Sequence, residues 1–126
     1  MKITTFNPLI VTKDAENTVK LFEELGFKKH HTKDDIGVFG VTNYRLKNDD
    51  GFYVDVTQST EQERTFIRIN VSDFDEAVEF FKSRGFRMAR HETAKDTIEN
   101  SSSKFNIMVS PSGFIIALSY HKKDKD

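Results

Sequence analysis

The sequence contains no cysteine and no tryptophan, and it has only two prolines and six glycines. The absence of cysteine excludes disulfide scaffolds, thiol nucleophiles and zinc sites built on thiolates. No run of about 18 apolar residues is present, so we expect no membrane-spanning helix. The first residues lack the apolar stretch of a secretory signal, and we therefore expect a cytoplasmic protein. Because 19 basic residues balance 20 acidic ones, we expect no nucleic-acid partner.

What the sequence does have is enough apolar material for one compact domain. Its 126 residues match the usual size of a single domain. Only 37% of the residues are hydrophobic, but 12 of them are phenylalanine, whose ring buries a large area. A chain of this length can form a core without covalent cross-links. We therefore expect a single globular domain over residues 1–126.

The sequence repeats itself. Residues 10–27 align with residues 69–86 at a constant offset, and the identical pairs are Ile10/Ile69, Asp14/Asp73, Val19/Val78, Phe22/Phe81, Gly26/Gly85 and Phe27/Phe86. Residues 51–57 align with residues 113–119 at a slightly larger offset, so the second half contains a longer loop. An internal repeat of this kind predicts two similar structural modules.

Each half is predicted to fold as a strand, a helix and three further strands. Asp14 and Asp73 are candidate helix N-caps, and Asp73 is followed by Glu76 as in a capping box. Gly26 and Gly85 are placed to end the two helices in the left-handed conformation. The predicted strands are residues 5–12, 28–33, 37–46 and 52–58 in the first half and residues 65–71, 87–92, 104–109 and 114–120 in the second.

These elements give the expected organisation of the chain. Module one covers about residues 3–58, a polar linker residues 59–64, and module two about residues 65–120. Residues 121–126 read as a solvated tail. The polar run of residues 91–103 predicts a loop inside module two.

Paired βαβββ modules that open with strand–Asp–helix–Gly-Phe and close with Pro-x-Gly-Phe-x-x-x-Leu resemble the vicinal oxygen chelate superfamily. This superfamily includes glyoxalase I, extradiol dioxygenases, fosfomycin-resistance enzymes and bleomycin-resistance proteins. The resemblance covers residues 3–120. It implies an α+β fold in which two tandem modules form curved, barrel-like mixed sheets, with helices outside and a ligand cavity between the modules.

The resemblance also implies where a metal would be bound. Metal-dependent members have a His or Gln ligand in the first strand of each module and a glutamate in the last strand. The corresponding residues are Asn7 and Asp55 in module one and Phe66 and Ala117 in module two. Because Phe66 and Ala117 offer no ligand atom, we expect no metal and no cofactor.

Strand alternation predicts which side chains face the cavity. The candidate ligand-binding residues are Asn7, Tyr53, Asp55, Phe66, Arg68 and Ala117. Asp55 and Arg68 either form a salt bridge across the sheet or are exposed at an open edge, or Arg68 binds an anionic group of a ligand. Phe66 and Tyr53 either pack in the core or stack on a planar ligand.

The sequence thus favours a glyoxalase/bleomycin-resistance-like protein that binds a small organic ligand, planar or anionic, without a catalytic metal. One alternative is a divergent lyase, isomerase or dioxygenase of the same superfamily, with Asp55 as a general base. Another is an effector-sensing or interaction module. The resemblance implies a homodimer, and unpaired strand edges also favour pairing between chains.

Overall fold

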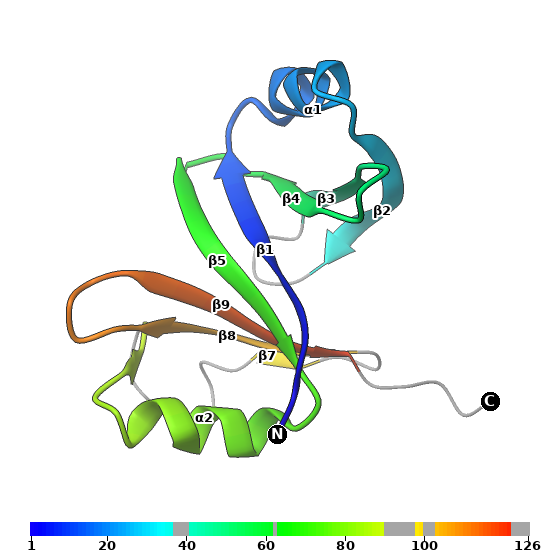
Figure 1. Ribbon diagram of the computed structural model, residues 1–126. Coiled ribbons are helices and arrows are strands. Elements are labelled where there is room, and N and C mark those ends of the chain that lie inside the picture. Colours follow the sequence, from blue (N-terminus) through cyan, green and yellow to red (C-terminus); the bar gives the residue numbers. More distant parts are fainter. Residues whose placement is uncertain (37–40, 62, 90–97, 100–102, 122–126) are drawn as a thin grey trace. The chain divides into compact units, whose positions relative to one another are not determined.

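The structure, a computed structural model, describes residues 1–36, 41–61, 63–89, 98–99 and 103–121. This part of the chain forms two helices and nine strands, most of which are labelled in Figure 1. The elements are β1 (Ile3–Thr12), α1 (Ala15–Glu24), β2 (Lys28–Ile36), β3 (Val41–Lys47), β4 (Tyr53–Gln58), β5 (Arg64–Val71), α2 (Phe74–Lys82), β6 (Arg87–Met88), β7 (Ile98–Glu99), β8 (Ser103–Val109) and β9 (Ile115–His121). No helix among these residues is long and apolar enough to cross a membrane.

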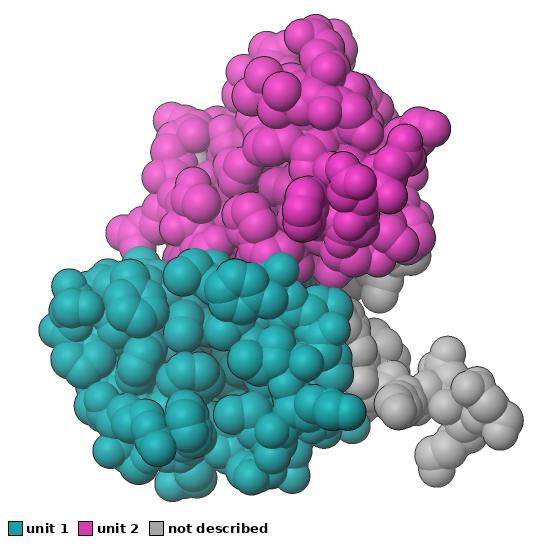
Figure 2. Space-filling model, in the orientation of Figure 1, with its two compact units in different colours: residues 1–6, 67–126 teal, residues 7–66 magenta. Residues whose placement is uncertain are grey.

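The chain divides into two compact units, which Figure 2 shows in different colours. Unit 2 consists of residues 7–66, and unit 1 consists of residues 1–6 together with residues 67–126. The first residues of β1 therefore belong to unit 1, although the rest of that strand belongs to unit 2.

Unit 2 is a layer of strands with α1 packed on one side. Its strands follow the order β2-β3-β4-β1, in which β1 and β4 are parallel and the other pairs antiparallel. The core contains the buried residues Ala15, Val19, Leu46, Val54 and Val56, with Ile10, Phe22, Phe27 and Tyr44 packed around them. Since Val54 and Val56 face the core beside α1, the alternate residues of β4 project from the opposite side of the sheet.

Unit 1 has the same plan. Its strands follow the order β5-β9-β8-β6, β7 also pairs with β8, and β5 and β9 are parallel. Helix α2 packs on a core of Ile69, Val71, Phe74, Ala77, Val78, Met88, Met108, Ile116 and Leu118. Each unit is thus one helix on an open mixed sheet, and the predicted α+β class is confirmed.

Repeated glycines end both helices as the sequence predicts. Gly26 and Gly85 have φ angles of 103° and 90°, the left-handed region in which glycine is preferred. A β-carbon at Gly26 would meet no atom within 4 Å, whereas one at Gly85 would lie 2.9 Å from the side chain of Pro111. Gly85 is therefore required both by its backbone angle and by its neighbour.

The N-caps of the two helices differ, and here the sequence prediction was only half right. The side chain of Asp73 accepts a hydrogen bond from the backbone N–H of Glu76 at 3.0 Å. Asp14 occupies the N-cap position, but its side chain forms no capping bond. Instead, the backbone N–H of Ala15 donates to Oε1 of Gln58 at 3.2 Å, so a residue of β4 takes over that role.

Two segments of module two differ in extent from the sequence prediction. Within the predicted loop of residues 91–103, Ile98–Glu99 form the short strand β7, which pairs with β8, and Ser103 already belongs to β8. Of the strand predicted at residues 87–92, the structure shows Arg87–Met88, and residues 90–92 lie outside the described residues. Residues 37–40 of the predicted third strand and residues 122–126 of the predicted tail also lie outside the described residues.

Candidate functional site

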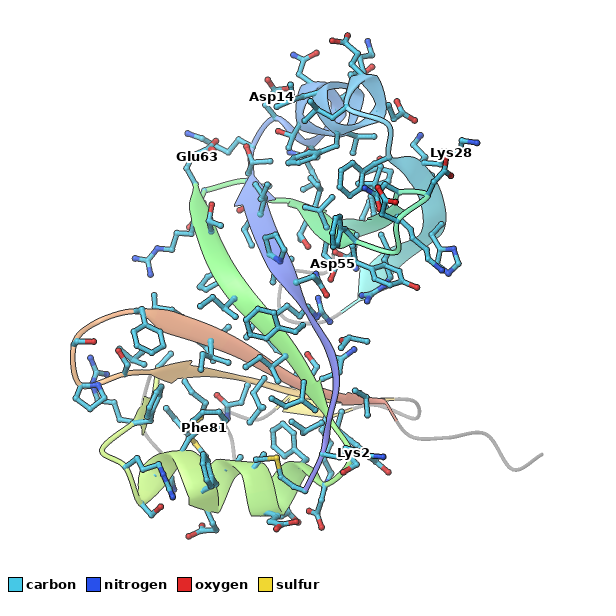
Figure 3. All side chains as sticks on the ribbon, viewed as in Figure 1. Lys2, Asp14, Lys28, Asp55, Glu63 and Phe81 are labelled. Carbon is cyan, nitrogen blue, oxygen red and sulfur yellow. The ribbon has the colours of Figure 1, made fainter. Side chains whose placement is uncertain are left out.

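The most constrained polar residue of unit 2 is Asp55 on β4, labelled in Figure 3. Its side chain is completely buried. Nη1 of Arg45 lies 3.1 Å from each of the two carboxylate oxygens, and the Arg45 side chain is 18% exposed. Since a buried charge is costly unless it is paired, this ion pair allows the carboxylate to remain inside the unit.

Arg45 was missing from the candidate residues predicted from the sequence. It lies on β3, directly opposite Asp55 in the antiparallel β3–β4 pair. The signal that could have found it is the Asn48–Gly51 turn, because residues at equal distances on either side of a tight turn face each other. In that register Lys47 faces Tyr53, Arg45 faces Asp55 and Asn43 faces Thr57.

Asn7 on β1 is the second partner of Asp55. Its amide nitrogen donates to Oδ2 of Asp55 at 2.9 Å and to the backbone oxygen of Pro8 at 2.8 Å. Two acceptors on this nitrogen fix the orientation of the amide. Asn7 is only 3% exposed, and its buried Oδ1 accepts no hydrogen bond from the residues that the structure describes.

Tyr53 begins β4 and is surrounded by basic side chains. The guanidinium carbon of Arg45 lies 4.3 Å from the centre of its ring, and Nζ of Lys47 lies 5.3 Å from the same centre. The ring of His30, on β2, makes an edge contact at 5.8 Å. Arginine and lysine are attracted to the face of an aromatic ring.

The equivalent part of unit 1 has different chemistry. Ala117 on β9 faces Ile107 on β8, the repeat counterparts of Asp55 and Arg45. Arg68 on β5 is the parallel neighbour of Ala117, and two positions further along Asn70 lies beside Ser119. Oδ1 of Asn70 and Oγ of Ser119 are buried and have no hydrogen-bond partner in the described part of the chain. Two apolar side chains therefore stand in unit 1 where unit 2 has the ion pair of Asp55 with Arg45.

The predicted site residues thus fall into two groups. The structure brings Asn7, Tyr53 and Asp55 together in unit 2, with Arg45 in their midst. Phe66 is buried on β5 at the last position of unit 2. Arg68 and Ala117 are neighbours in unit 1.

Comparison with known proteins relates this architecture to solved structures. A scan of protein families and a search of curated proteins both find no match to the sequence. A hypothetical protein from Bacillus halodurans C-125 superposes with a TM-score of 0.72 at 14% identity, over 100% of this chain and 99% of that one. For methylmalonyl-CoA epimerase from Mycobacterium tuberculosis the TM-score is 0.67 at 15% identity, over 96% and 90%. A glyoxalase/bleomycin resistance protein/dioxygenase superfamily member from Vibrio splendidus gives 0.60 at 14% identity, over 96% and 100%.

The chain has the vicinal oxygen chelate fold. At these identities the similarity concerns the arrangement of the chain, while the chemistry of the site has to be derived from its own residues.

The residues at the metal positions of this fold do not suit a metal ion here. Asp55 is the only carboxylate among them, and it is already bound to the cationic Arg45 and to Asn7. A cation placed on Asp55 would be repelled by the Arg45 guanidinium. Phe66 and Ala117 supply no donor atom, and a divalent ion requires several donors at one point. Within the described residues, no three His, Asp or Glu side chains gather as a possible metal site.

Proposed function

We propose that this protein binds a small organic ligand and uses no catalytic metal. The observation that carries the proposal is the ion pair of Asp55 with Arg45, because it converts the carboxylate position of the fold into part of a neutralised hydrogen-bonding cluster. Fixed polar groups beside an aromatic ring are typical of sites that orient small molecules. A planar or anionic ligand suits the arginine and tyrosine side chains best.

The same ion pair makes Asp55 a poor general base. A carboxylate that abstracts a proton needs an oxygen directed at the substrate, within about 3 Å of the proton donor. Both oxygens of Asp55 contact Arg45, and Oδ2 also accepts from Asn7. Proton abstraction would compete with these bonds, which is why binding is proposed instead of catalysis.

A thermal-shift experiment on chelator-treated protein tests this function. We expect no rise in Tm with Ni²⁺, Co²⁺, Mn²⁺, Zn²⁺ or Fe²⁺, and a rise with at least one compound from a panel of planar and anionic molecules. A ligand at 100 times its Kd stabilises the folded state by about 2.7 kcal/mol, which is readily measured. The matched variant is Asp55→Asn, which keeps the shape of the side chain and removes its charge. A metal that stabilises the wild type but not this variant would overturn the proposal.

We further propose that the protein forms a homodimer. In the described part of the chain β2 pairs only with β3 and β6 only with β8, so each unit has a strand with one free edge. Free edges favour pairing with another strand. Sedimentation velocity at increasing protein concentration should show a dimer of two 14.6 kDa chains. A monomer at all concentrations would contradict this expectation.

A further inference from the structure

Arg45 has hydrogen-bonding capacity that the protein does not use. A guanidinium carries five N–H donors, and Arg45 directs only Nη1 at Asp55. Within the part of the chain that the structure describes, Nε and Nη2 of Arg45 donate to no acceptor. The side chain is 18% exposed, so part of it remains accessible.

The guanidinium is held in a fixed orientation. Asp55 holds one end of the guanidinium, and the Tyr53 ring lies 4.3 Å from its central carbon. A side chain fixed on two sides loses little entropy when a ligand binds, because its rotamer is already selected. An edge of two N–H donors is the geometry that binds a carboxylate or phosphate through two hydrogen bonds.

Two lysines add positive charge on the same side of the sheet. Lys47 is the cross-strand partner of Tyr53, and Lys28 is the partner of Lys47 on β2. Directly opposed residues share a face, and two like charges there destabilise the sheet unless something offsets them. Neither lysine forms an ion pair within the described residues. Lys28 is labelled in Figure 3.

Asn7 supplies a group of opposite character. Its Oδ1 is a buried acceptor with no donor among the described residues, and an unpaired buried acceptor is unfavourable. The amide nitrogen of Asn7 and Nη1 of Arg45 both bind Oδ2 of Asp55, so the two side chains lie within two hydrogen-bond lengths of each other. A ligand bound to Arg45 would therefore lie beside Asn7.

We infer that Arg45, Lys47, Lys28 and Asn7 form a site in unit 2 for a small organic acid that carries a hydroxyl or amine next to its carboxylate. The carboxylate binds the free edge of Arg45, the two lysines supply long-range attraction, and the hydroxyl or amine donates to Oδ1 of Asn7. The inference rests on the proposed function, and it adds the chemical class of the ligand and the residues that select it.

The experiment uses NMR titrations of the full ¹⁵N-labelled chain with glycolate, acetate and inorganic phosphate. We expect glycolate to shift the backbone signals of residues 45–47 and 53–55 in a saturable manner. Acetate lacks the hydroxyl and should bind about fivefold more weakly, as one hydrogen bond contributes about 1 kcal/mol. Tighter binding of phosphate than of glycolate would overturn the assignment to a carboxylate.

Charge variants separate a site from general attraction. Lys47→Gln should weaken glycolate binding about threefold, in line with the strength of a partly exposed ion pair. Lys29→Gln is the matched control. Like Lys47→Gln, it removes one positive charge, here from β2. Lys29, however, lies over the ring of Tyr44, which packs against the core of unit 2. Equal weakening by both variants would mean nonspecific attraction and would overturn the inference.

The variant Arg45→Gln/Asp55→Asn tests the central group. It removes both charges together, so no buried charge is left unpaired, and the thermal melt checks that it folds. We expect it to lose saturable glycolate binding, whereas unchanged binding would overturn the inference. If panel compounds stabilise the protein but leave residues 45–47 and 53–55 unshifted, this site is wrong and the proposed function stands. If nothing binds, both are wrong.

Discussion

Asp55 has no exposed surface, and its burial makes the stability of unit 2 depend on Arg45. Removing one partner of a buried pair leaves the other charge unpaired in a poorly solvated place. We expect Asp55→Ala to lower the free energy of unfolding by about 3 kcal/mol or more, measured by urea denaturation. The double variant Asp55→Leu/Arg45→Met should lose less than the sum of the single changes, because it leaves no unpaired charge.

An exposed ion pair serves as the control for this prediction. On α1, Nζ of Lys20 lies 3.8 Å from Oε2 of Glu16, and both side chains are largely exposed. Glu16→Gln should change the unfolding free energy by only about 0.5 kcal/mol or less. Similar losses for Asp55→Ala and Glu16→Gln would show that the buried pair is not a stabilising feature of unit 2.

Glu63 should make the stability of unit 2 depend on pH. The backbone N–H of Lys13 and the hydroxyl of Thr12 donate to its carboxylate at 3.0 and 2.8 Å, and these bonds hold the pKa of Glu63 below its usual value. A lowered pKa in the folded state stabilises the protein above the pKa of the unfolded chain, and this stabilisation is lost as the pH falls through the folded value.

Urea denaturation at several pH values tests this prediction. Below about pH 4.3, the usual pKa of glutamate, the wild type should lose stability more steeply than Glu63→Gln, which cannot titrate. At neutral pH the variant should be the less stable of the two. Parallel stability curves for the two proteins between neutral and acid pH would show that these bonds do not favour the ionised form.

At the same scale, the sequence located Asp55 but not its partner. The repeat and the resemblance identify individual positions along the chain, and Asp55 was found in this way. Arg45 is defined by pairing across the β3–β4 hairpin, so its role depends on register and on the length of the turn. Free polar atoms such as Oδ1 of Asn7 are properties of packing, which no pattern of residues along the chain reports.

Among the elements, the two helix starts offer a matched pair because they occupy equivalent positions in the repeat. We expect Asp73→Ala to destabilise unit 1 by about 1 kcal/mol, since the hydrogen bond to the N–H of Glu76 is lost. Asp14→Ala should cost less, because the side chain of Asp14 caps no backbone N–H of α1. Gln58→Ala should weaken α1 more than Asp14→Ala does, as Gln58 accepts from Ala15.

Thermal denaturation of the three single variants provides the comparison. A ranking with Asp14→Ala as the most destabilising change would contradict the observed hydrogen bonds. The N-cap positions could be read from the sequence, since aspartate before an apolar period marks a helix start. The capping of α1 by Gln58 instead of Asp14 could not be predicted from the sequence, because it requires β4 to lie beside the start of α1.

The elements themselves were largely predictable for a physical reason. Gly26 and Gly85 mark both helix ends because glycine adopts the left-handed backbone conformation at low cost, whereas other residues are strained in it. The strands between them follow from alternation of core and non-core residues. Strand β7 was missed, since a two-residue strand in a polar stretch has no periodicity to detect.

For the whole molecule, the first residues of the chain link the stability of unit 1 to a segment that lies far from it in the sequence. Residues 1–6 precede unit 2 in the sequence but belong to unit 1. Lys2 and Ser72 exchange two hydrogen bonds of 2.9 Å, one from the Lys2 N–H to the Ser72 hydroxyl and one from the Ser72 N–H to the Lys2 carbonyl. The repeat in the sequence does not reveal that residues 1–6 belong to unit 1, because it assigns the first strand to module one.

Deleting residues 1–6 should therefore loosen unit 1 first. Hydrogen exchange should accelerate about tenfold in α2, the change expected for a loss of about 1.4 kcal/mol of local stability, and less in α1. Lys2→Ala is the control, because it keeps both bonds to Ser72 through the backbone of residue 2 and should leave α2 protected. Faster exchange in α1 than in α2 after the deletion would show that the first strand stabilises the unit it precedes in sequence instead.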